Sequence, residues 1–298
     1  MKEINRRNFL RTSAALSLGL STSCISPDEK ALFEISLAQW SLHRLLESRE
    51  LSNLQFPEFT KKTFGIDAVE YVNGFFPNNT DTYLKDLKKR CDDHGVKSVL
   101  MMCDGLGDLG DQDKTKRRKV VENHFSWVES AKFLGCHSIR VNAKSTGSYD
   151  EQMNLAADGL TQLAIFAKTL KMNVIVENHG GLSSNGKWLE SLMKKVDLEN
   201  CGTLPDFGNF NDYDRYQGVR ELMPYAKGVS AKSHEFDSRG REVHSDYEKM
   251  MKLVLDAGYR GYVGIEYEGN KHSEIEGIKL TRNLLRKIQQ KQFKNYKS

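Results

Sequence analysis

Three acidic residues end short apolar runs of this chain, at Glu177, Asp206 and Glu266. The runs read MNVIVE (172–177), CGTLPD (201–206) and YVGIE (262–266), a composition that predicts parallel strands buried on both faces. The carboxyl ends of such strands build the active site of parallel α/β proteins, so the three carboxylates are expected to converge. A single carboxylate at a strand end often only caps a helix, but three in nearby units favour a metal or acid/base site.

Eight apolar runs of this kind follow one another along the chain. The other five are FEISLAQ (33–39), GIDAVEY (65–71), VKSVLMM (96–102), CHSIRVN (136–142) and GVSAKSH (228–234). Successive runs end 28 to 40 residues apart, a spacing that fits one strand and one helix each time. We therefore predict an α/β protein with a single (β/α)8 TIM barrel over residues 31–298. An open doubly wound sheet is the alternative, disfavoured because no glycine-rich phosphate loop follows the first run.

Helical patterns fill the segments between the runs. In 81–95 and 116–135 apolar residues recur at helical spacing, and both segments finish at a glycine, Gly95 and Gly135, as helix C-termini often do. The other predicted helices cover 149–170, 186–198, 214–225, 244–258 and 272–292. No Pro- or Gly-rich linker divides the chain, which favours one domain after the N-terminal segment.

The N-terminal segment carries most of the net charge of +4, since Lys2, three arginines and Glu3 place +3 within the first eleven residues. The remainder is nearly neutral, which argues against a nucleic-acid partner. Residues 5–11, NRRNFLR, followed by the apolar TSAALSLGL (12–20), resemble a twin-arginine export signal. The apolar part is far shorter than the roughly 20 residues that span a bilayer.

Cys24 follows small residues at the end of this segment, as in a lipoprotein cleavage site, although ordinary cleavage is an equal alternative. We therefore assign 1–30 to a signal segment and tether, and expect a periplasmic protein or one anchored to the cell envelope by a lipid. The four other cysteines are widely spaced, without a CxxC pair, and are expected to be small buried side chains rather than disulfides.

His234 ends the seventh run and stands between the second and third acidic residues in strand order. Three carboxylates and an imidazole match a divalent ion that prefers oxygen ligands. Mn²⁺ is the expected cofactor, with Mg²⁺, Co²⁺ or Zn²⁺ as alternatives. The predicted metal ligands are Glu177, Asp206, His234 and Glu266.

Several segments of the chain resemble the xylose isomerase-like superfamily of sugar isomerases and epimerases. They are AQWSLHR (38–44), VIVENHGG (174–181), LPDFGNF (204–210), VSAKSHEFD (229–237) and GYRGYVGIEYEG (258–269). The resemblance implies that Glu177, Asp206 and Glu266 hold the metal. It also implies proton transfer through an enediolate, with Glu177 and Glu266 as the catalytic base and acid.

Two positions depart from the superfamily pattern. The superfamily often has a histidine three residues after the aspartate of the sixth strand, and this chain has Asn209 there. The superfamily also usually has a histidine on the seventh strand, two residues before a lysine; here the lysine is Lys232 and the histidine position is Ser230. His234 is then a displaced ligand two residues beyond Lys232 on the same strand face. Alternatively, the protein supplies only three ligands, holds the metal weakly or lacks it.

Further residues at the rim are expected to bind substrate. Trp40 and His43 resemble the aromatic wall against which these enzymes pack the sugar, with Trp40 as a plain core residue the alternative. His179 and Asn178 are candidate donors to sugar hydroxyls, although Asn178 equally suits a turn before two glycines. The remaining candidates are Asn142, Asn209 and Lys232, with Arg140 beside Asn142 on the fourth run.

The expected function is a metal-dependent isomerase or epimerase of an unphosphorylated sugar or sugar derivative, since phosphorylated sugars are cytoplasmic. One alternative is a lyase or deglycosidase that eliminates a group β to the ketone of an oxidised glycoside. Another is a non-catalytic sugar-binding lipoprotein. The expected partner is a small carbohydrate; the sequence sets no expectation for the oligomeric state.

Overall fold

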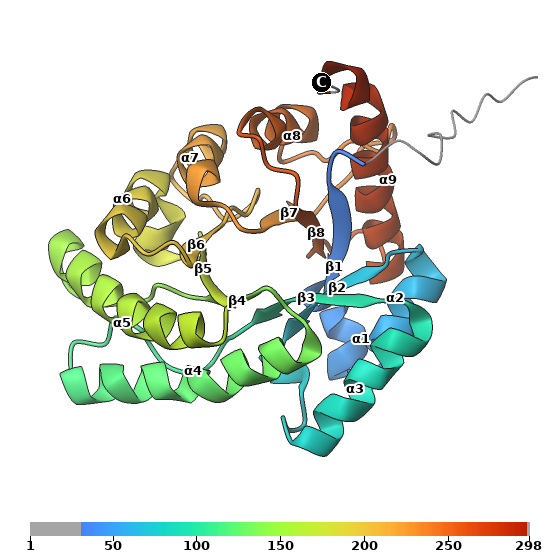
Figure 1. Cartoon of the computed structure of the whole chain (residues 1–298). Helices are drawn as coiled ribbons and strands as arrows, with labels where there is room; N and C mark the ends of the chain where they lie inside the picture. Colours follow the sequence, from blue (N-terminus) through green and yellow to red (C-terminus); the bar gives the residue numbers. More distant parts are fainter. Residues whose placement is uncertain (1–30, 297–298) are drawn as a thin grey trace, which may run out of the picture. The chain divides into compact units, whose positions relative to one another are not determined.

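The computed structural model describes residues 31–296, so the predicted export signal and lipidation site lie outside the described residues and stay predictions. Within this range each predicted apolar run coincides with one strand to within one residue at its carboxyl end or lies around it (Figure 1). The strands are β1 (Glu34–Ala38), β2 (Ala68–Val72), β3 (Lys97–Met102), β4 (Ser138–Val141), β5 (Asn173–Glu177), β6 (Cys201–Leu204), β7 (Val229–Ser233) and β8 (Tyr262–Tyr267).

All strand pairs in this eight-stranded sheet are parallel, and the sheet runs in the order β6-β5-β4-β3-β2-β1-β8-β7. Strand β1 pairs with both β2 and β8, as a barrel requires. Between β6 and β7 the barrel closes through isolated bridges, one of which joins Asp206 to Ser230. The predicted (β/α)8 barrel is therefore confirmed, and its seam lies beside one of the three acidic residues.

Helices alternate with the strands and surround them (Figure 1). The α-helices are α1 (His43–Glu47), α2 (Phe56–Phe64), α3 (Asp81–His94), α4 (Lys114–Leu134), α5 (Tyr149–Thr169), α6 (Gly186–Val196), α7 (Arg215–Leu222), α8 (Tyr247–Asp256) and α9 (Glu274–Gln292). Short 3-10 helices are η1 (Gln39–Leu42), η2 (Asn73–Phe75), η3 (Gly181–Ser184), η4 (Met223–Tyr225) and η5 (Phe293–Asn295). No helix in the described part of the chain is both long and apolar enough to cross a membrane.

The helix ends follow from local sequence. Gly95 and Gly135 adopt positive φ angles of 63° and 98° at the ends of α3 and α4, as predicted. Helix α2 was not predicted, because its nine residues give a short pattern and Pro57 stands in its first turn, where proline is tolerated. The four predicted core cysteines, Cys91, Cys103, Cys136 and Cys201, are buried and free of disulfides.

Alternation along the strands sets which side chains face the barrel interior. Ile175 on β5 and Leu204 on β6 belong to an inner cluster of buried apolar residues, whereas Val174 and Val176 pack outward against the helices. Glu177 lies two residues beyond Ile175, and it therefore faces the interior at the carboxyl end of the barrel. The apolar side chains of the inner cluster thus form the floor of the region that the carboxylates occupy.

Candidate active site

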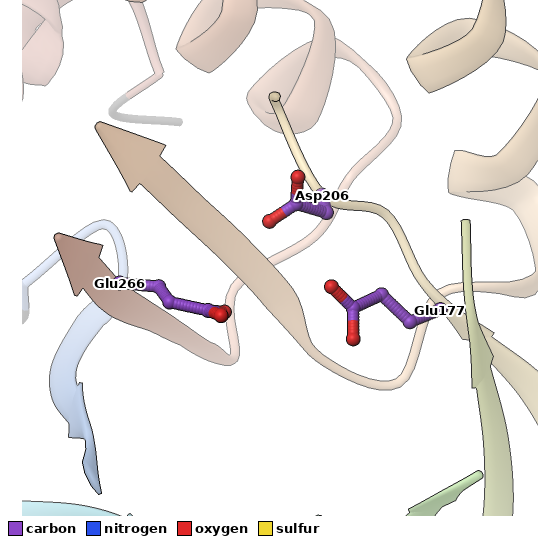
Figure 2. A group of neighbouring side chains, drawn as sticks. All are labelled: Glu177, Asp206 and Glu266. Atoms are coloured by element: carbon purple, nitrogen blue, oxygen red, sulfur yellow. The ribbon is translucent and has the colours of Figure 1, made fainter. Parts of the chain in front are cut away.

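The carboxylates of Glu177, Asp206 and Glu266 point toward one common space at the carboxyl end of the strands (Figure 2). Each offers an oxygen within 4.8 Å of an oxygen of the other two, and all three residues are buried. The structure thus brings together the three acidic residues that the sequence singled out.

Asp206 lies two residues beyond the end of β6 and is held there by backbone hydrogen bonds. Its Oδ1 accepts from the N–H groups of Gly208 and Asn209, both at 2.8 Å. Asn178 fixes the main chain of the aspartate, since its Nδ2 donates to the Asp206 carbonyl at 3.0 Å and its Oδ1 accepts from the Asp206 N–H at 2.8 Å. The amide of Asn178 is therefore engaged with the main chain of Asp206 rather than presented to a substrate.

Ser230 lies between Asp206 and Glu266. Its Oγ is 2.6 Å from Asp206 Oδ2 and 2.9 Å from Glu266 Oε2. One hydroxyl hydrogen serves one carboxylate at a time, so the second contact is best satisfied when one of the two acids carries a proton. The hydroxyl thus couples the two acids at the seam of the barrel.

His234 lies one residue beyond β7 and does not join the three carboxylates. Its backbone N–H donates to Glu242 Oε1 at 3.3 Å, and its ring centroid is 6.0 Å from that of His244. On β7 the side chains that face the barrel interior are those of Ser230 and Lys232, two residues apart. The strand ends at Ser233, so its alternation no longer sets the direction of the His234 side chain. The structure thus places Ser230, rather than His234, beside the predicted metal ligands.

Lys232 is buried among carboxylates. Its Nζ lies 3.3 Å from Glu266 Oε1, 3.1 Å from Glu268 Oε1 and 4.0 Å from Asp206 Oδ2. Burial alone would lower the pKa of Lys232, but the surrounding carboxylates hold that pKa well above its usual value. Burial likewise works to raise the pKa of Glu266, yet Lys232 and Arg140 outweigh it and keep the pKa below its usual value. Glu266 and Lys232 are therefore a charged pair.

For Glu177, burial outweighs the neighbouring positive charge in setting the pKa. Its Oε1 accepts a hydrogen bond of 2.9 Å from Asn209 Nδ2, and its Oε2 lies 3.0 Å from Arg140 Nε. The Arg140 contact is not aligned as a hydrogen bond, which leaves Oε2 buried without a hydrogen-bond partner among the described residues. Burial, only partly offset by Arg140, raises the pKa of Glu177 to about 8.

Arg140 links the site to an acidic residue that the sequence reasoning missed. Its Nη1 donates to Asp104 Oδ1 at 2.6 Å, and Asn142 Nδ2 donates to the same oxygen at 2.7 Å. Asn142, predicted to bind substrate, thus supports Asp104, while its own Oδ1 is buried without a partner among residues 31–296. Asp104 comes two residues after β3, so a search for acids just past strand ends would have found it.

Trp40 and His43, the two residues of the predicted aromatic wall, lie against each other directly after β1. Trp40 lies in η1, partly buried against the inner cluster, and its ring stacks on His43 with centroids 5.0 Å apart. His43 Nδ1 donates to the Trp40 carbonyl at 2.8 Å, so this histidine supports the tryptophan. His179 follows β5, and its side chain is exposed. Partial desolvation lowers the pKa of His179, and the positive charges of Arg140 and Lys232 lower it further.

The donor set fits a divalent cation. Five carboxylates gather around the two buried cations Arg140 and Lys232, namely Asp104, Glu177, Asp206, Glu266 and Glu268. The excess of negative charge, the all-oxygen donors and the unpartnered Oε2 of Glu177 suit a hard ion such as Mn²⁺ or Mg²⁺. Glu177, Asp206 and Glu266 are the residues that would hold it.

Proton competition is expected to make cation binding depend on pH. Burial raises the pKa of Asp206 to about 6 and that of Glu177 to about 8, and a cation requires both in the ionised form. The affinity for Mn²⁺ should therefore increase as the pH rises through this window, by up to about tenfold per pH unit for each displaced proton. Titration calorimetry at several pH values measures this, and an affinity that is constant from pH 5.5 to 8.5 (about three units) would contradict it.

The same groups predict the opposite trend for the stability of the metal-free protein. Their folded-state pKa values lie above the unfolded values, so the folded state binds more protons between about pH 4 and pH 8. The free energy of unfolding should thus decrease as the pH rises through that range. Thermal unfolding with a chelator present checks the sign.

A barrel with acidic residues at the carboxyl ends of β5, β6 and β8 defines a class of TIM-barrel proteins with a strand-end acidic centre. The chain belongs to the xylose isomerase-like TIM barrel family, whose model matches residues 60–288. The proteins to which the chain is similar include an L-ribulose 3-epimerase and a deglycosidase subunit.

The chain is similar to one curated protein and to two solved structures that are described next. The 3'-dehydrocarminate deglycosidase alpha subunit of Microbacterium sp. is 20% identical, over 69% of this chain and 78% of that protein. An L-ribulose 3-epimerase structure has a TM-score of 0.72 at 15% identity, covering 88% of this chain and 96% of the other. A structure of the IOLI protein with a zinc atom has a TM-score of 0.70 at 16% identity, covering 87% and 99%. At these identities the structural matches establish the fold.

Proposed function

We propose that the protein is an exported, metal-dependent enzyme that removes a proton from the carbon beside the carbonyl of an unphosphorylated sugar derivative, as an isomerase or epimerase. The observation that carries the proposal is the pairing of Glu177 with Glu266. The two carboxyls share one site, but burial raises the pKa of Glu177 to about 8, while Lys232 and Arg140 keep the pKa of Glu266 below its usual value. Two carboxyls with such divergent pKa values are suited to separate acid and base roles.

In this proposal Glu177 and Glu266 divide the transfer: one takes the proton from carbon, and the other returns one to the substrate. Lys232 and Ser230 hold the Glu266 carboxylate in a fixed orientation, through contacts of 3.3 Å and 2.9 Å. Asn209 and Arg140 do the same for Glu177. When bound at Glu177, Asp206 and Glu266, a divalent ion supplies stabilisation of negative charge on a sugar oxygen. The pattern of residues 5–20, which resembles an export signal, supports an unphosphorylated substrate.

A second candidate reaction is elimination from a keto-glycoside, and similarity to a deglycosidase favours it. The first half is shared: the carbon next to the ketone gives its proton to a carboxylate. The bond between the neighbouring carbon and the aglycone oxygen then breaks, the electron pair leaves with that oxygen, and a carboxylic acid protonates it. The sugar product is an unsaturated ketone, and no oxidant is consumed.

Product analysis separates the two reactions. The purified protein is loaded with Mn²⁺ and incubated with free keto-sugars and with keto-glycosides, and the products are followed by mass spectrometry. An isomerase or epimerase retains the mass of the substrate, whereas the lyase releases the aglycone. Saturable binding of these compounds without either product would instead support a non-catalytic sugar-binding protein.

A further inference from the structure

A large apolar cleft lies between the segments that follow β1 and β2. Its volume is about 780 Å³, and its walls include Trp40, Leu51, Leu54, Phe75, Phe76 and Tyr83. Cavities that hold drug-sized molecules span about 300–1,000 Å³ and are mostly apolar with a few polar groups. The cleft has the size and the lining for a ring system larger than a sugar.

The cleft and the proposed active site are built on the same inner cluster of apolar side chains. Trp40 and Phe75 stand 5.9 Å apart between ring centroids, and both pack on the inner cluster that contains Ile175 and Leu204. Glu177 lies two residues beyond Ile175 on the same side of the sheet. The aromatic walls of the cleft and the carboxylates therefore rest on a common apolar floor.

A chain of hydrogen bonds leaves a donor free on the cleft wall. Gln39 Nε2 donates to Asn53 Oδ1 at 2.7 Å, and Asn53 Nδ2 donates to the Tyr83 hydroxyl at 2.9 Å. The hydroxyl accepts this bond, and its own hydrogen has no acceptor among residues 31–296. Arg49, also on the cleft, makes no ion pair with any described residue. Both groups are available to an oxygen atom of a ligand.

A smaller cavity of about 410 Å³ lies beside Gly208 and Glu268 and differs in character. Arg215, Glu235, His244, Glu268 and Lys271 line it, and Lys271 pairs with Glu235. Such charged walls do not favour an apolar ring. The aromatic cleft is therefore the better candidate for the non-sugar part of a substrate.

We propose that the cleft between η1, α1, α2 and η2 binds the aglycone of a keto-glycoside, a flat apolar ring system that carries an oxygen at its edge. The keto-sugar lies at the carboxylates, so the inference rests on the proposed function and holds for either reaction. Trp40, Phe75 and Phe76 pack against the ring, and Tyr83 donates a hydrogen bond to the edge oxygen. The substrate class is thus aromatic glycosides oxidised to the ketone.

The test compares 2-naphthyl and methyl 3-keto-β-D-glucosides as substrates of the Mn²⁺-loaded protein. The naphthyl compound should have a KM at least about tenfold lower. Leu54→Asn should remove most of this preference while leaving the KM of the methyl compound within about twofold. Ile275→Asn, a matched change in a different groove, should alter neither. Equal KM values for the two substrates, or equal losses in both variants, would overturn the inference.

Binding without turnover keeps the inference and the proposed function separable. Fluorescence of 2-naphthol measures occupancy of the cleft directly in wild type, Leu54→Asn and Ile275→Asn. Binding that Leu54→Asn weakens, with no reaction of either glucoside, would support the cleft and contradict the proposed enzyme. Reaction of both glucosides, with no naphthol binding and no preference, would support the enzyme and contradict the cleft.

Discussion

Replacing Glu177 by glutamine is expected to lower the rate of carbon-proton transfer by about 10²–10⁴-fold, the contribution of a positioned acid or base. Glutamine keeps the size of the side chain and an oxygen that can contact a cation, but it cannot carry the transferred proton. The residue is buried beside Arg140, which loses one of its two carboxylate contacts and keeps the one with Asp104, so the melting temperature must be measured together with the rate. The expected result is a folded protein with little activity.

Glu190→Gln is the matched control for this change. Glu190 lies on α6 and pairs with Lys187 and Lys194 at the surface, away from the three carboxylates. Its replacement should leave the rate within about twofold, because exposed ion pairs contribute little. A Glu177→Gln protein that is folded and retains the rate of the control would remove Glu177 from the mechanism.

Replacing Lys232 by methionine is expected to destabilise the metal-free protein by about 3–5 kcal/mol, the usual loss when one partner of a buried charge pair is removed. The buried ammonium faces Glu266, Glu268 and Asp206, and without it these carboxylates repel one another. The same excess of negative charge should strengthen the binding of a divalent cation. Stability and Mn²⁺ affinity are therefore predicted to change in opposite directions.

Chemical denaturation and titration calorimetry measure the two effects of Lys232→Met separately. Lys271→Met serves as the control, since Lys271 pairs with Glu235 at an exposed position and should contribute less than about 1 kcal/mol. If Lys232→Met weakened Mn²⁺ binding, the lysine would act with the ion rather than compete with it for the carboxylates. That result would contradict the charge balance derived for the site.

The barrel could be predicted from the sequence because parallel strands that are buried on both faces consist of nearly uninterrupted apolar residues. Each apolar run overlaps one strand, and Glu177 and Glu266 lie at or near the strand ends where the runs end. Asp206 was predicted too, although β6 ends two residues earlier at Leu204. Its inward direction depends on Asn178, a contact between neighbouring units that no local pattern reveals.

The side chains around the carboxylates were less predictable, because they depend on where β7 ends. Alternation along β7 directs the side chains of Ser230 and Lys232 inward. The strand stops at Ser233, so the same alternation does not apply to His234. The predicted run extends one residue beyond the strand and led to the prediction of His234 as a metal ligand, whereas the structure places Ser230 beside Asp206. The contact of Arg140 with Glu177 depends on the pairing of β4 with β5, which only the folded sheet defines.

The most direct test of the proposed chemistry is exchange of the carbon-bound proton in D₂O. Wild-type protein with Mn²⁺ is incubated with a keto-sugar or keto-glycoside panel, and deuterium at the carbon beside the carbonyl is measured by NMR. Deuterium should appear at this carbon of the substrate or of the product with the wild-type protein, and it should be lost with Glu177→Gln. Product formation without deuterium in any position, or no exchange with any keto compound while the compounds bind, would contradict proton abstraction at Glu177 and Glu266.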